Sequence, residues 1–274
     1  LVTLVILLAK LFSPNRRTPL SLYVQQNLKK HKLRFLHPYE RLVARFVTTF
    51  LYCSEGVKDV LRWKGIRTHC HYFALPFDEE SYRPLPFSPQ RSPFRLGYLG
   101  RISEDKGMAV LVAAVEELRA QGDEIELVVG GNGPLVDELT RHPFVRYLGL
   151  IPHSQAHTFY ETIDCFVLPS QTRPHWKEQF GRVIVESLAA GRPVIGSSSG
   201  SIPEVLSRAG WNWVFQEDSP AELARKIREL RQRLSTPAGE AELARAVEQN
   251  FRLFSMESVA RDIHQEFQRQ VGGS

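Results

Sequence analysis

From residue 94 onward, short apolar runs alternate with amphipathic segments, and this alternation limits the fold of the chain more than any other feature. The runs lack the in–out alternation of a half-exposed strand, which is typical of strands buried on both faces of a sheet. We expect such strands at residues 94–100, 125–131, 145–150, 164–170, 193–197 and 211–215. Apolar strands that alternate with helices predict an α/β fold built on a doubly wound parallel sheet.

The segments between these runs read as helices, because apolar residues recur in them at helical spacing and glycine or proline stands at their ends. They are expected at residues 107–122, from Pro134, at 154–163, between Gly181 and Gly191, and at 202–208, whereas 219–270 reads as helices alone. Ligands of open parallel sheets bind beyond the carboxyl ends of the strands. The turns that follow the strands are therefore the places to search for site residues.

The first 93 residues are organised differently. A short apolar strand is expected at 19–24 and a helix–strand–helix pattern at 38–63, with Ser54 as the N-cap of the second helix. A proline-rich passage follows, which is typical of a linker. We therefore divide the chain into a partial N-terminal domain (1–75), a linker (76–93), a main domain (94–252) and a final helical segment (253–274).

The chain begins with Leu1 and an apolar run, residues 1–12, that contains Lys10. A signal peptide carries its positive charge before the apolar run, and a run of this length is too short to span a bilayer. A buried strand or helix from the middle of a domain explains the run better. We expect the sequence to be a fragment that lacks its upstream part.

The net charge of +5 hides an uneven distribution. Residues 1–75 carry 13 Lys and Arg against 3 Asp and Glu, whereas the remainder carries 22 against 27. The basic side chains gather in one block, at Lys29, Lys30, Lys32, Arg34, Arg41 and Arg45. A solvated basic face is the simplest interpretation, and contact with an anionic membrane surface or a phosphorylated acceptor stays open. Nucleic acid is the weaker interpretation, because no recognition motif accompanies the charge.

The three cysteines, Cys53, Cys70 and Cys165, form no CxxC pair and are odd in number, which favours a reducing compartment over a disulfide framework. His69 and His71 flank Cys70, but neighbours in an extended segment face opposite ways, and no matching ligand pair stands elsewhere. We therefore expect no metal site. We expect a cytoplasmic protein, with peripheral contact at the inner membrane face left open by the basic block.

Two glutamates, Glu178 and Glu186, bracket the segment EQFGRVIVE at the start of a predicted helix. A helix N-terminus favours a phosphate, because unpaired N–H groups and the macrodipole both attract negative charge. Carboxylates beside such a site are suited to accept hydrogen bonds from hydroxyl groups attached to the phosphate, as in a nucleotide sugar. By itself such a pair is more often solvated or capping, so the surrounding residues decide its interpretation.

Two further turns carry groups that suit a phosphorylated ligand. Arg101 follows the first strand of the main domain and Lys106 precedes its helix, so two cations are expected where a diphosphate would bind. The next turn, Gly130-Gly131-Asn132-Gly133-Pro134, lets the backbone pass close to a ligand. It is not a complete GxGxxG, and the chain has no P-loop, which argues against an NTPase.

A long loop precedes Glu178 and can close over a substrate. It carries four polar or aromatic residues in succession, at Arg173, His175, Trp176 and Lys177, with one proline between them. His175 is a conceivable acid or base, although a loop histidine beside tryptophan is more often just exposed.

Together these segments resemble the donor-binding domain of retaining GT-B glycosyltransferases, of the large family-4 or group 1 class. The matching elements are Gly100-Arg101, Lys106, GGNGP at 130–134, Glu178 and Glu186 with Phe180-Gly181, AAGRPVIG at 189–196 and SGSIPEV at 199–205. Residues 40–82 also resemble the end of the family's first domain and its linker. The resemblance implies a GT-B fold: a doubly wound, Rossmann-like C-terminal domain, a partial Rossmann-like N-terminal domain, and a final helix that packs back on the latter.

The resemblance also implies roles for single residues. Arg101 and Lys106 would bind the donor diphosphate and stabilise it as a leaving group in place of a metal ion, and Glu178 would hold hydroxyls of the donor sugar. These three are the catalytic candidates, and Glu186 would accept hydrogen bonds from the ribose. The remaining donor-binding residues are expected at Gly100, Gly131, Leu150 and Ile151 (near the base), Phe180, Gly181, Arg182 and Val183. No cofactor is implied beyond the nucleotide-diphosphate sugar, which is the donor substrate.

The implied activity is retaining, metal-independent transfer of a sugar from a nucleotide-diphosphate sugar to a glycan or lipid-linked acceptor, as in polysaccharide biosynthesis. The chain departs from the family in holding only the last part of the first domain, so the alternative is a non-catalytic nucleotide-sugar-binding fragment. A dinucleotide-dependent oxidoreductase is a weaker rival. It would need a full GxGxxG after the first strand and an acidic residue after the second, where Gly130-Gly131-Asn132 stands instead.

Overall fold

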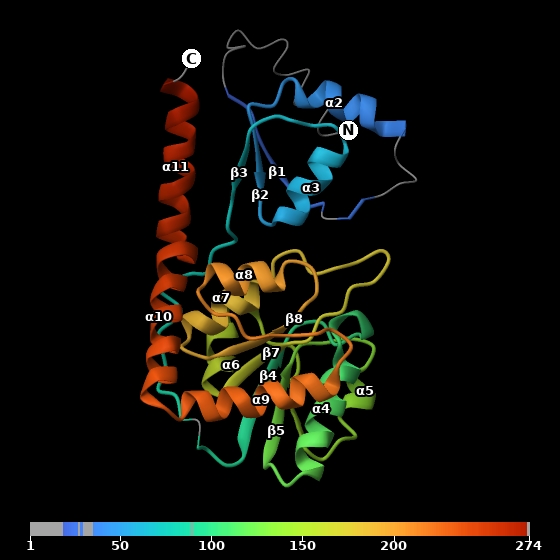
Figure 1. Cartoon of the computed structure of the whole chain (residues 1–274), viewed down its shortest axis with the longest axis vertical. Coiled ribbons are helices and arrows are strands. Elements are labelled where there is room, and N and C mark those ends of the chain that lie inside the picture. The colour runs from blue at the N-terminus through green and yellow to red at the C-terminus, as the bar shows by residue number, and fades with distance from the viewer. Residues whose placement is uncertain (1–18, 27, 30–34, 89, 273–274) are drawn as a thin grey trace. The chain divides into compact units, whose positions relative to one another are not determined.

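A computed structural model describes residues 19–26, 28–29, 35–88 and 90–272 (Figure 1). The chain divides into two compact units, which are described separately: the first holds residues 1–75 and 257–274, and the second holds residues 76–256. The element expected at residues 1–12 and three residues of the basic block, Lys30, Lys32 and Arg34, lie outside the described part.

The second unit is built on a parallel sheet of six strands. In chain order these are β4 (Phe94–Leu99), β5 (Ile125–Gly130), β6 (Val145–Tyr147), β7 (Cys165–Leu168), β8 (Val194–Ser197) and β9 (Val214–Phe215). Their order across the sheet is β6-β5-β4-β7-β8-β9, so the chain winds outward from β4 in one direction and from β7 in the other. The gap between the carboxyl ends of β4 and β7 is thus the point where ligands of doubly wound sheets bind.

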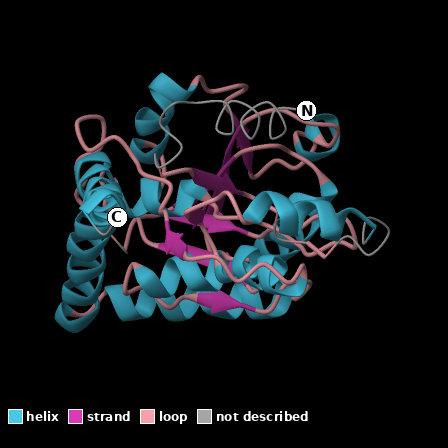
Figure 2. Ribbon diagram, turned by 90° about the horizontal axis from the view of Figure 1, so that it is seen from above, coloured by secondary structure: helices cyan, strands magenta, loops and turns pink. Residues whose placement is uncertain are grey.

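Helices cover both faces of this sheet (Figure 2). They are α4 (Met108–Ala120), α5 (Val136–Leu139), α6 (Ala156–Glu161), α7 (Arg182–Ala189), α8 (Ile202–Arg208), α9 (Pro220–Leu234) and α10 (Pro237–Phe254), with short 3₁₀ turns η2 (Glu104–Lys106) and η3 (His153–Gln155). On one face α9 packs against α4, and α10 packs against α7. The central strands β7 and β8 are fully buried, and β4 and β5 are mostly buried, which explains their hydrophobicity. The predicted doubly wound parallel sheet is confirmed.

The two long helices that follow the sheet, α9 and α10, begin at residue types that are favoured as N-caps. Ser219 accepts a hydrogen bond from the backbone N–H of Glu222 at 3.3 Å, and Thr236 accepts one from Gly239 at 3.2 Å. In both cases proline occupies the first turn, where its missing N–H costs nothing because no intrahelical partner exists there. These caps fix where α9 and α10 start.

The first unit contains a three-stranded parallel sheet in the order β1-β2-β3. Its elements are β1 (Ser21–Val24), α2 (His37–Ala44), β2 (Thr49–Tyr52), α3 (Glu55–Trp63), β3 (Cys70–Tyr72) and residues 257–272 of α11 (Met256–Gly272). Figure 1 shows α2 and α3 on one side of these strands and α11 on the other. A small core of Ala44, Val47, Phe50, Leu61 and Ile66 fills the space between α2, α3 and the sheet.

The strand β3 was not predicted from the sequence. Its residues alternate between the two faces: Cys70 packs against the small core, whereas His71 lies 2.7 Å from the Asp262 carboxylate on α11. Glu266 of α11 is buried beside Thr49 of β2, at 3.5 Å. This face of the sheet is therefore polar, and a polar strand of three residues carries almost no hydrophobic signal.

None of the helices in the described part of the chain combines the length and hydropathy that a bilayer-spanning segment needs.

Candidate functional site

A cavity of about 560 Å³ opens in the second unit, at the carboxyl end of its central strands. It is lined by Leu99, Gly100, Arg101, Gly131, Asn132, Leu150, Ile151, His153, Ala156, Arg182, Val183 and Glu186. Most of the residues predicted to bind the donor are therefore brought together from four separate segments of the sequence. The apolar part of the lining includes Leu150, which is 75% exposed.

Strand register explains why the two glycine turns meet at the cavity. Leu99 of β4 pairs with Gly130 of β5, so the residues that follow them, Gly100 and Gly131, are neighbours. Gly131 has a φ of +129°, and a Cβ atom there would lie 1.8 Å from the carbonyl oxygen of Gly100. No side chain fits in that space, and the cavity wall at this point is bare backbone.

Glu186 contributes a carboxylate to the lining of the cavity. It lies on α7 and is only 4% exposed, yet its carboxylate has polar neighbours. The Tyr160 hydroxyl donates to Oε2 at 3.1 Å, and Nε2 of His153 lies 3.9 Å from Oε1. Burial raises the pKa of the Glu186 carboxyl, while the Tyr160 hydrogen bond and the nearby His153 and Arg182 act in the lowering direction.

Lys106 and Glu178 form a second group at the same edge of the sheet. The Lys106 ammonium lies 2.7 Å from Oε2 of Glu178, and the Ser170 hydroxyl donates to the same oxygen at 3.1 Å. The ammonium also lies 4.4 Å from the centre of the Trp176 ring, at cation–π distance. The backbone carbonyl of Glu178 accepts a hydrogen bond from the N–H of Ser201 at 3.2 Å, which ties the residue to the turn after β8.

The long loop before Glu178 is organised by a two-way backbone pairing. The N–H of Arg173 donates to the carbonyl of Trp176 at 2.7 Å, and the N–H of Trp176 donates back at 3.1 Å. This pairing closes a tight turn and brings the indole ring over Lys106. His175, at the tip of the turn, is exposed.

Three other predicted site residues are held in place by local contacts. Phe180 is 2% exposed and packs edge-on against Phe254, with ring centres 6.0 Å apart, so its side chain anchors the segment. Gly181 has a φ of +76° and caps the N-terminus of α7, which directs the following N–H groups outward. Arg101 is exposed, and its carbonyl accepts a hydrogen bond from Tyr98 at 2.6 Å that fixes the turn.

Two polar neighbours of the Glu186 carboxylate were missed by the sequence reasoning. Tyr160 lies on the apolar face of α6 and reads as core, and His153 lies in an unremarkable turn before that helix. Neither position carries a local signal. A buried tyrosine hydroxyl normally forms a hydrogen bond. The sequence therefore indicated that Tyr160 would have an acceptor, but not which residue provides it.

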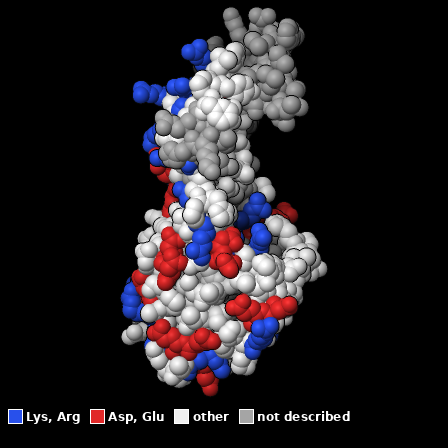
Figure 3. Space-filling model, turned by 90° about the vertical axis from the view of Figure 1, so that its right-hand side faces the viewer, with Lys and Arg blue, Asp and Glu red and all other residues white. Residues whose placement is uncertain are grey.

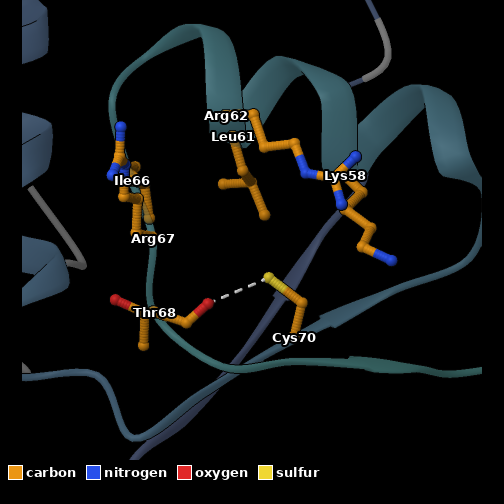
Figure 4. Close-up of a pocket in the computed structure, with 7 residues that line it drawn as sticks. All are labelled: Lys58, Leu61, Arg62, Ile66, Arg67, Thr68 and Cys70. Atoms are coloured by element: carbon orange, nitrogen blue, oxygen red, sulfur yellow. Dashed lines mark hydrogen bonds between the residues drawn. The ribbon is translucent and has the colours of Figure 1, made fainter.

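A second cavity, of about 520 Å³, lies in the first unit (Figure 4). It is lined by Lys58, Leu61, Arg62, Ile66, Arg67, Thr68 and Cys70. Lys58 pairs with Glu55 at 3.5 Å, and the Cys70 thiol donates to the Thr68 carbonyl at 3.2 Å. Burial raises the pKa of that thiol, so it stays protonated and is a poor nucleophile. No predicted site residue lines this cavity.

The comparison with protein families gives one match. Residues 93–233, just over half of the chain, match the family described as "Glycosyl transferases group 1". Within the described residues no group of three or more His, Cys, Asp or Glu is arranged to hold a metal ion.

Curated relatives match over parts of the chain of similar length. Glycogen synthase of Mycobacterium tuberculosis is 29% identical over 168 residues, which cover 59% of this chain and 39% of the relative. A GDP-mannose-dependent alpha-(1-6)-phosphatidylinositol monomannoside mannosyltransferase of the same organism is 29% identical over 183 residues, 61% of this chain and 48% of the relative. The matched part is thus less than half the length of these relatives.

Solved structures resemble nearly the whole chain. HepE of Anabaena in complex with UDP and glucose aligns with a TM-score of 0.73 at 19% identity, over 97% of this chain and 76% of that one. A glycosyltransferase from Rickettsia africae aligns with a TM-score of 0.74 at 16% identity, over 93% and 71%. At this identity the likeness concerns the fold, and it confirms the predicted GT-B type with two Rossmann-like parts.

Proposed function

The chain belongs to the group 1 glycosyltransferases, and on this premise we propose that it transfers a sugar from a nucleotide-diphosphate sugar to a glycan or lipid-linked acceptor. We further propose that the anomeric configuration is retained and that cationic side chains replace a metal ion at the diphosphate. One observation carries the proposal. The cavity between the carboxyl ends of the central strands is lined in part by a buried carboxylate, and an ion-paired lysine lies at the same sheet edge.

The cavity has the chemistry of a nucleotide site. Its apolar part, with Leu150 and Ile151, suits the flat face of a base. Glu186 contributes to the lining a carboxylate that can accept hydrogen bonds from two neighbouring hydroxyl groups, as a ribose offers. Gly100 and Gly131 present bare backbone where a bulky phosphate would approach.

The remaining predicted residues would bind the diphosphate and the sugar. Arg101 and the Lys106 ammonium supply positive charge for the phosphates, which stabilises them as the bond to the sugar breaks. Glu178 contacts Lys106 directly, so a phosphate held by that ammonium brings its attached sugar next to the Glu178 carboxylate. Glu178 would then accept hydrogen bonds from the sugar hydroxyls.

The proposed reaction exchanges one bond at the anomeric carbon for another. The bond from this carbon to the phosphate oxygen breaks, and its electron pair stays on the diphosphate. The acceptor oxygen attacks from the same face, and its proton passes to the departing phosphate oxygen. The configuration is therefore retained, and neither glutamate has to carry a proton.

The first unit suggests where a membrane-bound acceptor would be met. On α2 and just before it, Phe35, Tyr39 and Leu42 are exposed, and exposed Arg41 and Arg45 lie on the same helix or next to it. In the view of Figure 3 the charged atoms of this unit are predominantly basic. Apolar side chains flanked by cations favour an anionic lipid surface, so we propose a cytoplasmic protein that contacts the inner membrane face peripherally.

A turnover assay tests the activity. The chain is incubated with UDP-, GDP- and ADP-sugars and an acceptor in the presence of EDTA, and proton NMR follows the anomeric configuration of the new linkage. Retained configuration without divalent metal is expected. An inverted product, or turnover that needs a metal ion, would contradict the proposal.

The second candidate is a nucleotide-sugar-binding fragment that does not turn over. It is favoured by the small first unit, in whose described part only three strands form the sheet, and by the partial coverage of the relatives. Binding of the donor without formation of any product would favour this candidate.

A further inference from the structure

Tyr160 is the one side chain of α6 whose hydroxyl reaches the carboxylate in the lining of the cavity. Its residue is 0% exposed, and its hydroxyl donates to Oε2 of Glu186 at 3.1 Å. The carbonyl oxygen of Val183 lies 3.4 Å from the same hydroxyl. The other carboxylate oxygen, Oε1, is the one nearer to the exposed His153, at 3.9 Å.

We propose that Tyr160 is a positioning residue for donor binding, which engages Oε2 of Glu186 and leaves Oε1 to accept hydrogen bonds from the nucleotide. The inference rests on the proposed function, because it takes Glu186 as a ribose-binding group. It goes further because it names a residue that does not contact the donor but orients the Glu186 carboxylate that does.

The burial of Tyr160 excludes a direct role. A side chain with no exposed surface cannot contact a ligand in the cavity, and Tyr160 is not among the residues that line it. Its ring is held by three aromatic neighbours: Tyr82, Phe159 and Phe166 lie at ring-centre distances of 5.9, 5.6 and 6.0 Å. The ring is therefore held in place, and of the two acceptors within reach of its hydroxyl the Glu186 carboxylate is the nearer, at 3.1 Å against 3.4 Å for the Val183 carbonyl.

The hydrogen bond also acts on the charge of the carboxylate. A buried carboxyl group tends to take up a proton, and burial does raise the pKa of Glu186. A protonated Glu186 would lose acceptor capacity for the ribose hydroxyls. The Tyr160 hydroxyl stabilises the ionised form, and because burial raises its own pKa well above the usual value, it stays protonated and remains a donor at neutral pH.

The effects of the other titratable and charged groups near Glu186 can be distinguished from the effect of Tyr160. His153 on η3 and Arg182 at the start of α7 lie on the cavity side and stabilise the ionised carboxylate, His153 only when it is protonated. The Tyr82 ring packs against the Tyr160 ring. Burial raises the pKa of Tyr82, and the negative charge of Glu186 raises it further. Tyr160 is thus the buried donor to Glu186, and the cavity-side groups are exposed to the ligand.

The test compares Tyr160→Phe with Tyr82→Phe as a matched control. Both variants remove one hydroxyl from a buried tyrosine and keep the ring, so the packed core is preserved. Calorimetry measures the binding of UDP, GDP and ADP to the full chain between about pH 5 and pH 8. Circular dichroism establishes that each variant is folded.

We expect Tyr160→Phe to weaken binding of the preferred nucleotide about tenfold at neutral pH. Because the ionised carboxylate loses a stabilising donor, the acid-side loss of affinity should also move to higher pH. Tyr82→Phe should leave both the affinity and the position of this pH limb unchanged. In a Glu186→Gln background, Tyr160→Phe should no longer move the pH limb, because glutamine does not titrate.

The outcomes distinguish this inference from the proposed function. If the unaltered chain binds none of the three nucleotides, the proposed function fails. If it binds and Glu186→Gln weakens binding, but Tyr160→Phe matches the unaltered chain at every pH, the positioning role alone is wrong. A loss of the same factor at every pH, without movement of the acid limb, would mean a structural role only and would also overturn it.

Discussion

The ammonium of Lys106 and the carboxylate of Glu178 are 2.7 Å apart, although 72 positions separate them in the chain. One follows β4 and the other precedes α7, and the pair joins the two halves of the doubly wound sheet at its carboxyl edge. Both partners are mostly buried, with 20% and 12% of their side-chain surface exposed. The contact links the cation proposed for the diphosphate to the acid proposed for the sugar.

Replacing Lys106 by alanine should lower kcat by about a hundredfold, because a cation that stabilises the leaving diphosphate would be lost. Steady-state kinetics with the preferred donor measures the effect. Lys226→Ala provides the control: this lysine lies on α9 and pairs with Glu229 at 3.5 Å. Equal rates in the two variants would remove Lys106 from the mechanism.

The Trp176 ring should contribute to the rate by holding the Lys106 ammonium. Trp176→Leu removes the aromatic face and should slow turnover about three- to tenfold, in keeping with the usual strength of a cation–π contact. Trp176→Phe retains an aromatic face and should recover part of the loss. If the leucine and phenylalanine variants turn over at the same rate, the ring acts only by filling space.

Glu186→Gln should have opposite effects on stability and binding. Burial raises the pKa of this carboxyl in the folded state, so its contribution to the free energy of unfolding is most favourable at low pH and is lost as pH rises through the folded-state pKa. A neutral glutamine avoids that loss, and the variant should be more stable than the unaltered chain at neutral pH while it binds nucleotide more weakly. Urea unfolding as a function of pH measures the difference. A glutamine variant that is less stable at neutral pH would contradict the assignment.

Gly131→Ala should destabilise the second unit by about 1–3 kcal/mol and abolish donor binding. Its φ of +129° is unfavourable for alanine, and the new Cβ would collide with the Gly100 carbonyl oxygen. Gly122→Ala is the matched control, because Gly122 also has a positive φ, +91°, but a Cβ there meets nothing within 4 Å. The urea midpoints of the two variants should therefore differ, because Gly122→Ala loses stability only through the positive φ, whereas Gly131→Ala also loses stability through the collision with the Gly100 carbonyl. Equal destabilisation in both would show that the close approach does not matter.

The exposed apolar residues around α2 should drive peripheral membrane binding. Leu42→Glu should weaken sedimentation with vesicles that contain anionic lipid by about tenfold, since it removes apolar surface and adds repulsive charge. Leu253→Glu alters a similarly exposed leucine of the second unit and should have little effect. Vesicle binding that is insensitive to Leu42→Glu would exclude this surface.

The sequence predicted the second unit well because its strands are buried on both faces. Runs such as residues 125–131 and 164–170 read as buried strands, and the helix end at Gly191 carried its own signal. The first unit was harder, because the strand β3 is short and polar and becomes recognisable only when α11 covers it. Packing between distant segments, not local pattern, defines that strand.

The sequence pointed to most of the residues that line the cavity, but not to the contacts among them. The turns drew attention to these residues, and the resemblance to the family implied the role of each. Strand register explains why Gly100 and Gly131 meet at the cavity. The pairing of Lys106 with Glu178 depends on tertiary geometry that no local pattern encodes. Tyr160 looked like an ordinary core residue, because a hydroxyl that points inward leaves no trace in hydrophobic periodicity.

The central claim is that the cavity lined in part by Glu186 binds the nucleotide of a sugar donor. Calorimetric titration of the chain with UDP-, GDP- and ADP-sugars in the presence of EDTA tests this claim most directly. We predict that one of these donors binds at a single site without divalent metal, and that Glu186→Gln weakens its binding at least about tenfold. Binding that requires a metal ion, or that is unchanged by Glu186→Gln, would contradict the account.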